Sequence, residues 1–486
     1  MPAYYLEIIV VVLGLILLMA EAFMNRRTKD SIAFLAIIGL GVVLGLLMFG
    51  TDCEHQTIWG VYEVDHWAHF YKGIALVTTI IVLVMSLNYK SVVKQYTSQD
   101  ETHAGLGEFY CLPLFACAGL MWMASAVDLI TIFVALELVT MTFYVLVTYL
   151  RRNVGSLEAG VKYLILGALA TGFLVYGITW TFGITGETNL AKIGTKLASG
   201  EVPKAAALFA FGLLMVGLGF KVAAAPFQIW VPDVYQGAAT PITAFLSVGS
   251  KAAGFIVLIR VVEPFINSPI GPEVVSIIAL LAGASLIYGN LAAIPQTNLK
   301  RLLAYSSISH AGFLLIAMTA IGADTEIVGP DAKATIAFYL ACYLAMTLLA
   351  FMVIAIVRAK LDLETIKGVE GLSERSKLLS IALVIALASL AGIPLTAGFV
   401  GKFFIFNIAV QQEQLALLAI AILGVAAGFY YYIKVIASIF RNAAKDPGED
   451  SPSPEPIEVG LFAKLAILLL IGAVILFGVY PSPLLP

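Results

Sequence analysis

The chain has 486 residues, of which 60% are hydrophobic and 12% are charged, with a formal net charge of −3. A soluble globular protein carries about 25% charged residues, because water must solvate its surface, so this composition excludes a soluble enzyme. The apolar residues suffice for about fourteen helices of about 20 residues, the length that crosses a bilayer. We therefore expect a polytopic membrane protein with little chain outside the bilayer.

Fourteen apolar runs, separated by polar breaks, predict the membrane spans in chain order. They fall at about 3–24, 31–50, 70–88, 108–127, 129–150, 159–183, 205–225, 240–262, 273–294, 301–321, 333–357, 378–410, 413–440 and 459–480. The strands of a membrane β-barrel are about ten residues long and alternate in polarity, so these longer uniform runs predict helices. No basic residue precedes the first run, so we expect a retained span rather than a cleaved signal peptide.

The loops predict the orientation and exclude several kinds of site. Alternate loops hold sixteen Lys and Arg residues and the opposite set holds four, so the first set is predicted to be cytoplasmic, with both termini on the other side. The cysteines form no C-x-x-C pair, and no basic cluster of the kind that binds nucleic acid occurs. His66 and His69, beside Asp65, are interpreted as a solvated loop, with a metal site as the weaker alternative.

Some basic residues lie within or beside the spans without indicating function. Lys72, Arg260 and Lys464 lie near predicted span ends, where long side chains reach the membrane interface. Lys162 lies one turn inside its span, and its role stays open. The first three positions therefore predict interfacial anchors rather than a site.

Five other charges lie deep in apolar segments, namely Glu137, Lys221, Lys251, Lys402 and Lys434. A charge at the bilayer centre costs at least about 2.5–3.5 kcal/mol on insertion scales, so a set of five indicates function. Burial favours the neutral form of a lysine and a nearby carboxylate favours the charged form, so such pairs can exchange protons. Glu137 is predicted to pair with Lys221, and structural ion pairs between helices are the alternative.

Two of these lysines lie beside interrupted spans. Lys221 is followed by AAAPFQIW, and Pro394, Gly398 and Gly401 precede Lys402. Non-helical backbone at membrane depth is tolerated only where protein or a wet cavity satisfies its polar groups, and it is typical of transport sites. His310, whose imidazole titrates near neutral pH, is either a further relay member or a packed core residue.

The polar groups also repeat along the chain. The first trio is Glu137, Lys221 and Lys251, and the second is His310, Lys402 and Lys434. The repeat predicts helices 1–3 over 1–107, a five-helix unit over 108–262, a second unit over 273–440, and a connecting loop with helix 14 over 441–486. Because five is odd, the two units are expected to be inverted relative to each other.

Three stretches carry a family resemblance: GFKVAAAPFQIWVPDVYQGAATPITAFLSVGSK (219–251), NLAAIPQTNLKRLLAYSSISHAGF (290–313) and SLAGIPLTAGFVGKF (389–403). They closely resemble subunit N of NADH–quinone oxidoreductase, the antiporter-like membrane subunit of respiratory complex I. The resemblance covers nearly the whole chain. PDVYQGA sets the chain apart from the sister subunits L and M and from Mrp-type antiporters.

The resemblance implies roles for residues already singled out. Glu137 matches the glutamate of helix 5, Lys221 and Lys402 the lysines of broken helices 7 and 12, Lys251 the lysine of helix 8, and His310 the histidine of helix 10. These residues would relay protons across the membrane.

Two positions depart from the family pattern. Lys434 lies in a helix-13 segment where the family often has arginine, and it is included in the predicted relay. Gln228 stands where many relatives have histidine, which puts a histidine-based step there in doubt.

The resemblance further implies a division of labour within a larger complex. NADH, FMN, iron–sulfur clusters and quinone would be bound by partner subunits, and this chain would hold no cofactor and no metal. Its partners would be the lipid bilayer, the antiporter-like subunit M and the small subunit K, in a bacterial inner membrane. The alternatives are an Mrp-type Na⁺/H⁺ antiporter subunit and a passive scaffold whose lysines only brace helices.

Overall fold

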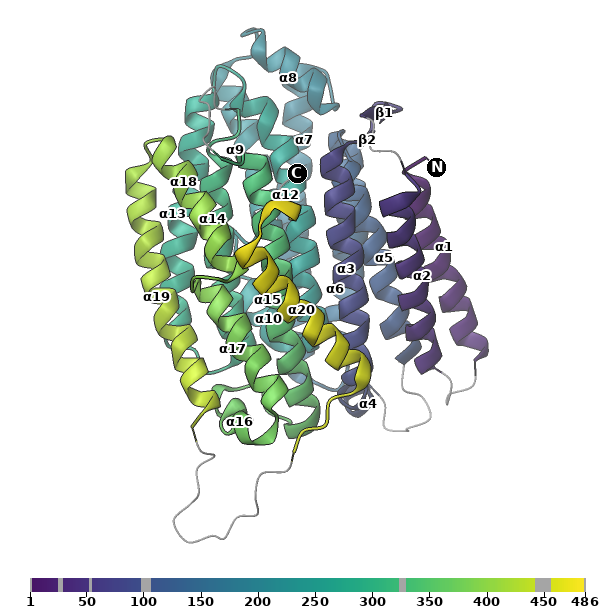
Figure 1. Cartoon of the computed structure of the whole chain (residues 1–486). Helices are drawn as coiled ribbons and strands as arrows, with labels where there is room; N and C mark the ends of the chain where they lie inside the picture. Colours follow the sequence, from purple (N-terminus) through teal and green to yellow (C-terminus); the bar gives the residue numbers. More distant parts are fainter. Residues whose placement is uncertain are drawn as a thin grey trace.

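A computed structural model describes residues 2–24, 29–51, 55–97, 106–322, 329–441 and 456–484. These residues form a bundle of long helices that run up and down between two ends (Figure 1). The N-terminus, strands β1 (Gln56–Ile58) and β2 (Tyr62–Val64) and helix α8 (Leu190–Ala198) lie at the upper end of Figure 1. Helices α4 (Lys90–Thr97) and α16 (Leu372–Arg375) lie at the lower end.

Thirteen described helices are long and apolar enough to span a membrane. They are α1 (Tyr5–Phe23), α2 (Asp30–Phe49), α3 (His66–Asn88), α5 (Leu106–Ser125), α6 (Leu129–Val147), α7 (Val154–Thr185), α9 (Lys204–Val222), the continuous run of α11 (Thr240–Phe245), η3 (Leu246–Ser250) and α12 (Lys251–Ile266), α13 (Gly271–Ala293), α14 (Leu299–Met318), α15 (Ala332–Leu361), α19 (Leu415–Ile439) and α20 (Leu461–Val479).

The fourteenth predicted span is present as two half-helices, α17 (Lys377–Ala391) and α18 (Ala397–Gln411). The all-helical fold with fourteen spans is therefore confirmed. In each predicted five-helix unit the fourth span is the broken one. Residues 442–455, most of the predicted loop before helix 14, lie outside the described residues.

One boundary differs from its prediction in a way that matters. Helix α3 begins at His66, so His66 and His69 lie in its first turns and the predicted solvated loop is wrong. The reason is Asp65, whose carboxylate accepts a hydrogen bond from the Ala68 amide at 2.7 Å and caps the helix.

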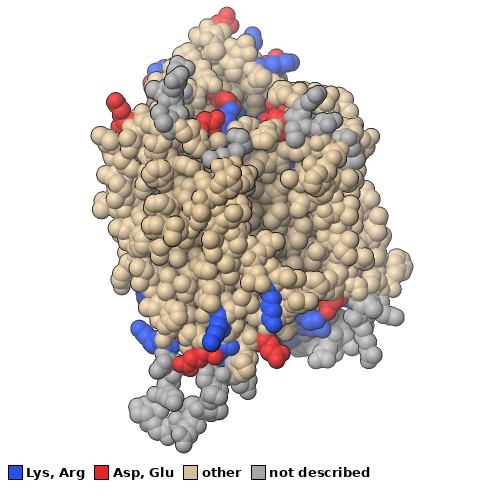
Figure 2. Space-filling view, in the orientation of Figure 1, with Lys and Arg blue, Asp and Glu red and all other residues tan. Residues whose placement is uncertain are grey.

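The inner helices are buried on all sides, and the outer ones present apolar faces to their surroundings. The α11–α12 run, α14 and α15 form the centre, whereas α1, α2, α7 and α20 are mostly exposed. Figure 2 shows an apolar band across one face of the molecule, with Lys, Arg, Asp and Glu gathered at its two ends. Apolar surface of this kind is suited to lipid tails, so the chain is a multi-pass membrane protein.

Candidate functional site

The first break follows helix α9, as AAAPFQIW predicts. Ala223 has φ +65°, in the left-handed region, and the backbone is not helical again until α10 (Val231–Gly237). Other residues satisfy the freed backbone groups: the Ala225 amide donates to Ser285 Oγ at 2.8 Å, and Trp230 Nε1 donates to the Phe220 carbonyl at 3.0 Å. Side chains other than that of Lys221 therefore satisfy the polar groups of this break.

The second break lies between α17 and α18. Gly392 (φ +90°) and Leu395 (φ +70°) turn the chain in the left-handed region. Lys402 Nζ donates to the carbonyls of Leu390 at 2.8 Å and Ala391 at 3.0 Å, which are free acceptors at the end of α17. Lys402 thus binds the negative end of a half-helix dipole.

Lys221 lies at the end of α9 and is 5% exposed. Its ammonium donates to Thr140 Oγ1 on α6 at 3.3 Å. Glu137 lies one turn away on α6, where it is half-buried and accepts a hydrogen bond from Thr171 at 2.8 Å. Among the ion pairs of the described chain none joins Glu137 to Lys221, so the two lie on adjoining helices with Thr140 near both.

Lys251 is 2% exposed and lies midway along the α11–α12 run, directly after the π-helix η3. Its Nζ donates to the carbonyl and the hydroxyl of Ser307 on α14 and lies 5.5 Å from the ring centre of Tyr343 on α15. Gly254 lies one turn after Lys251 and leaves room for the side chain of Lys221, because a Cβ at position 254 would lie 3.3 Å from Lys221 Cγ. The two lysines therefore occupy neighbouring positions.

His310 lies on α14 between Lys251 and Lys402. Its Nδ1 is 2.6 Å from the Tyr339 hydroxyl, and its ring centre is 5.2 Å from that of Tyr343, the ring that Lys251 also contacts. On the other side it lies 6.2 Å from the ring of Phe313, and Lys402 Nζ lies 5.3 Å from the same ring. The structure thus brings Lys251, His310 and Lys402 together around three aromatic rings.

Two candidates lie apart from this group. Lys434 is exposed on the outer face of α19, unlike the buried Lys251 that matches it in the sequence repeat. Lys162 is half-exposed and pairs with Glu158 and Asp233, each at 2.7 Å, at the lower end. Gln228 lies buried in the first break, where its Oε1 has no hydrogen-bond partner within the part of the chain that is described.

Of the three predicted interfacial anchors, one is exposed and two form ion pairs. Lys464 is exposed near the end of α20, as predicted. Lys72 is not an interfacial anchor, because it is buried in an ion pair with Glu7 at 2.9 Å. Arg260 lines a cavity at the upper end, where it pairs with Glu63 and Asp65 at 3.2 and 2.9 Å. Their partners are far away in the sequence, so position in a span could not predict the pairing.

The sequence analysis also missed the uncharged members of the site. Ser307, Tyr339, Tyr343 and Tyr432 all contact Lys251 or His310. The available signal was the spacing of Tyr339 and Tyr343, which puts two hydroxyls on one face of an apolar helix. Hydroxyl and imidazole groups both donate and accept hydrogen bonds, so this arrangement can pass a proton between lysines.

A cavity of about 340 Å³ opens at the lower end beside this group. Lys300 lies buried at its wall and pairs with Glu364 at 2.9 Å, and Arg301 pairs with Asp233 at 2.6 Å. Lys300 precedes Ser307 by two turns of α14. Tyr235, on α10, has its hydroxyl 3.4 Å from Ser307 Oγ. Tyr235 therefore contacts the residue that holds Lys251, and its neighbours Asp233 and Gln236 on α10 line the cavity.

Comparisons with known proteins agree with this fold. Residues 126–428 match the family described as NADH:quinone oxidoreductase/Mrp antiporter, TM. NADH-quinone oxidoreductase subunit N of Desulforamulus reducens is 36% identical over 481 residues, which cover 98% of this chain and 95% of the relative. A chain of respiratory complex I from Thermus thermophilus is 31% identical, with a TM-score of 0.79, over 99% of this chain and 98% of that one.

A chain of the Mrp complex from Dietzia sp. reaches the same TM-score of 0.79 over 99% of this chain and 95% of its own length, but at 19% identity. That likeness shows a shared fold. The identity to subunit N relatives over nearly the full length goes further, and so this chain belongs to the subunit N family of NADH–quinone oxidoreductase.

Proposed function

We propose that this chain translocates protons across the membrane as a subunit of respiratory complex I, by means of a relay that contains Lys221, Lys251, His310 and Lys402. The observation that supports the proposal is a series of buried ionisable groups on neighbouring helices. Lys221 packs against Gly254, one turn after Lys251, Tyr343 contacts both Lys251 and His310, and Phe313 lies against both His310 and Lys402. Buried charges of this kind are costly and mark ion pathways in membrane proteins.

In this proposal the lower end faces the cytoplasm, and both termini face the periplasm of a bacterial inner membrane. The cavity beside Lys300 then admits water from the cytoplasm, and Tyr235 and Ser307 pass a proton to Lys251. Each lysine alternates between a charged form, held by hydroxyls or carbonyls, and a neutral form favoured by burial. A change of charge at one lysine alters the field at its neighbour, so the groups act in turn.

Partner subunits supply the driving reaction. The redox chemistry of NADH, FMN, iron–sulfur clusters and quinone belongs to other chains of the complex, and this chain holds none of these groups. In this proposal the half-buried Glu137 on α6 lies close to a contact with a neighbouring subunit, either the small subunit K or the antiporter-like subunit M. A change at that contact would shift Glu137 relative to Lys221 and start the relay.

The test is Lys251→Met in the assembled complex. Because a positioned proton-transfer group contributes 10²–10⁴-fold in rate, we expect proton-coupled quinone reduction to fall at least about tenfold, with the amount of assembled complex unchanged. Lys464→Met, an exposed lysine on α20, is the matched control and keeps full activity. Normal proton pumping by Lys251→Met would exclude the relay, and pumping that requires Na⁺ would favour an Mrp-type antiporter instead.

A further inference from the structure

A second group of buried charges lies at the upper end, among helices that the relay does not use. Strand β2 separates two clusters there, because successive side chains of a strand point to opposite faces. Tyr62 and Val64 are buried on one face, whereas Glu63 points to the other, where it meets Arg260. Tyr62 faces the ion pair of Glu7 and Lys72 from α1 and α3.

The Glu7–Lys72 pair is more deeply buried than any interfacial anchor would be. Lys72 is 1% exposed and Glu7 is 5% exposed. Lys72 Nζ lies 2.9 Å from Glu7 Oε1, and the Tyr62 hydroxyl donates to the same oxygen at 2.9 Å and accepts a hydrogen bond from Lys72. Burial and the Glu7 carboxylate both raise the pKa of Tyr62 above its ordinary value, so Tyr62 stays protonated as a donor. Both donors thus converge on one carboxylate oxygen.

The second carboxylate oxygen, Glu7 Oε2, is buried and has no hydrogen-bond partner in the described chain. Several other buried atoms in the described ranges share this property, among them Ser125 Oγ, Tyr71 Oη and Arg260 Nε at this end of the molecule. Buried polar atoms are rarely left unpaired in native proteins, and the usual partner is water. The free oxygen of Glu7 is therefore a place where water or a proton can bind.

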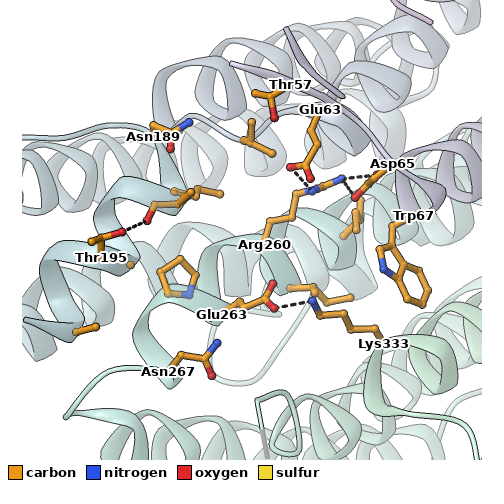
Figure 3. A pocket seen from close by; sticks show the side chains of 18 residues that line it. Thr57, Glu63, Asp65, Trp67, Asn189, Thr195, Arg260, Glu263, Asn267 and Lys333 are labelled. Carbon is orange, nitrogen blue, oxygen red and sulfur yellow. Dashed lines mark hydrogen bonds and ion pairs between the residues drawn. The ribbon is translucent and has the colours of Figure 1, made fainter. Parts of the chain in front are cut away.

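A cavity lies on the other face of strand β2, where Glu63, Asp65 and Arg260 line it. Ser125 lies between Ala124, whose carbonyl accepts from Arg260 at 3.1 Å, and Ala126, which pairs with Tyr62 through a backbone bridge. The cavity has a volume of about 560 Å³ and opens at the upper end. Figure 3 shows Arg260 between Glu63 and Asp65 in this cavity, with Glu263 and Lys333 paired beside it at 2.6 Å.

We propose that Glu7, Lys72 and Tyr62 form a further proton-binding site, which exchanges its proton with water of this upper cavity. The inference rests on the proposed function, in which the upper end is the release side. A proton from water forms an O–H bond at Glu7 Oε2, and the carboxylate becomes a neutral acid. The same O–H bond breaks when the proton returns to water, which restores the ion pair.

Several charged and titratable groups face the site from the elements packed around it. With Glu7 protonated, the Lys72 ammonium is left as an uncompensated buried charge, which is strongly unfavourable. The other titratable groups near the pair are His69 on α3, Cys117 on α5, and Glu63, Asp65 and Arg260 across β2. Arg260 is held by two carboxylates, so it adds little net charge.

A purely structural ion pair is the competing interpretation, and a double variant separates the two. Glu7→Gln with Lys72→Met removes both charges together, so neither is left buried and unpaired, and the complex is expected to assemble. We expect proton pumping at a given rate of quinone reduction to fall about tenfold, as for other positioned proton-transfer groups. The matched control is Lys204→Met with Glu273→Gln, an exposed ion pair of 2.6 Å at the same end.

Normal pumping by the double variant would overturn the inference and leave a structural ion pair. If the double variant does not assemble, Tyr62→Phe decides, because it removes only the hydroxyl: reduced pumping supports the site and normal pumping overturns it. Lys251→Met distinguishes failure of the wider function. If Lys251→Met pumps normally, the relay itself is wrong, whereas an effect at Lys251 without one at Glu7 and Lys72 removes only the upper site.

Discussion

The two broken helices carry the same sequence signature but use their lysines differently. At the first break, Ser285 and Trp230 satisfy the freed backbone, and Lys221 has one hydroxyl contact of 3.3 Å. At the second break, Lys402 itself donates to two helix-end carbonyls at 2.8 and 3.0 Å. The Lys221 ammonium is therefore held by one weak contact, whereas the Lys402 ammonium also stabilises the backbone of its break.

This difference bears on how buried charges are interpreted in transport proteins. A buried lysine is often assigned to proton transfer because of its cost, but Lys402 shows that the same charge can stabilise the break beside it. Loss of function at Lys402 would therefore mix a structural and a chemical effect. Lys221 separates them, since its removal takes away a buried charge and only one weak contact.

The largest predicted effect is a difference in stability between variants of these two lysines. Lys402→Met removes two hydrogen bonds from a charged donor, each worth about 1.5–3 kcal/mol, so we expect the complex to lose roughly 2–3 kcal/mol of stability. Lys221→Met is expected to be neutral or slightly stabilising, because an unpaired buried charge disappears. The measurement is the fraction of chain that remains assembled after detergent-solubilised membranes are heated.

Both variants are expected to pump protons poorly, so stability alone separates them. Lys402→Arg is the control, because it keeps a charged donor at the break. Equal heat sensitivity of Lys221→Met and Lys402→Met would show that the two breaks are held in the same way.

A smaller loss of stability is predicted at the first break, for a variant of Ser285. Ser285→Ala leaves the Ala225 amide buried without its acceptor, which costs about 1–3 kcal/mol. The same heating experiment measures this loss, and Ser276→Ala serves as the control, since that exposed serine on α13 bonds only within its own helix. Retained stability in Ser285→Ala would mean that another group satisfies the first break.

Much of the fold could be predicted from the sequence, because apolar length and loop charge act locally along the chain. The fourteen spans, the two breaks and the burial of Lys221, Lys251 and Lys402 all follow from composition within a segment. Contacts between segments did not follow in the same way. Glu137 was expected to pair with Lys221, but one turn of α6 puts Thr140 within reach of the ammonium instead.

The upper cluster illustrates the same limit more strongly. Lys72 lies one to two turns inside α3, where a lysine with a free path to water would serve as an anchor. Its partners are Glu7, in the first turn of α1, and Tyr62, in a short strand that no apolar run predicts. Only the packing of α1, α3 and the β1–β2 hairpin brings these residues together, so their pairing is a tertiary property.

The smallest predicted effect concerns the lysines of the fifth span in each unit. Lys251 is buried at mid-length of its helix, whereas Lys434 is exposed near the end of α19. Lys434→Met is therefore expected to change stability by no more than about 0.5 kcal/mol, as for other exposed sites, and to lower proton pumping far less than Lys251→Met. Parallel measurements of both variants in the assembled complex test this directly. A loss at Lys434 as large as that at Lys251 would mean that a neighbouring subunit covers α19 and buries this lysine, so that the second unit would be completed by its partner.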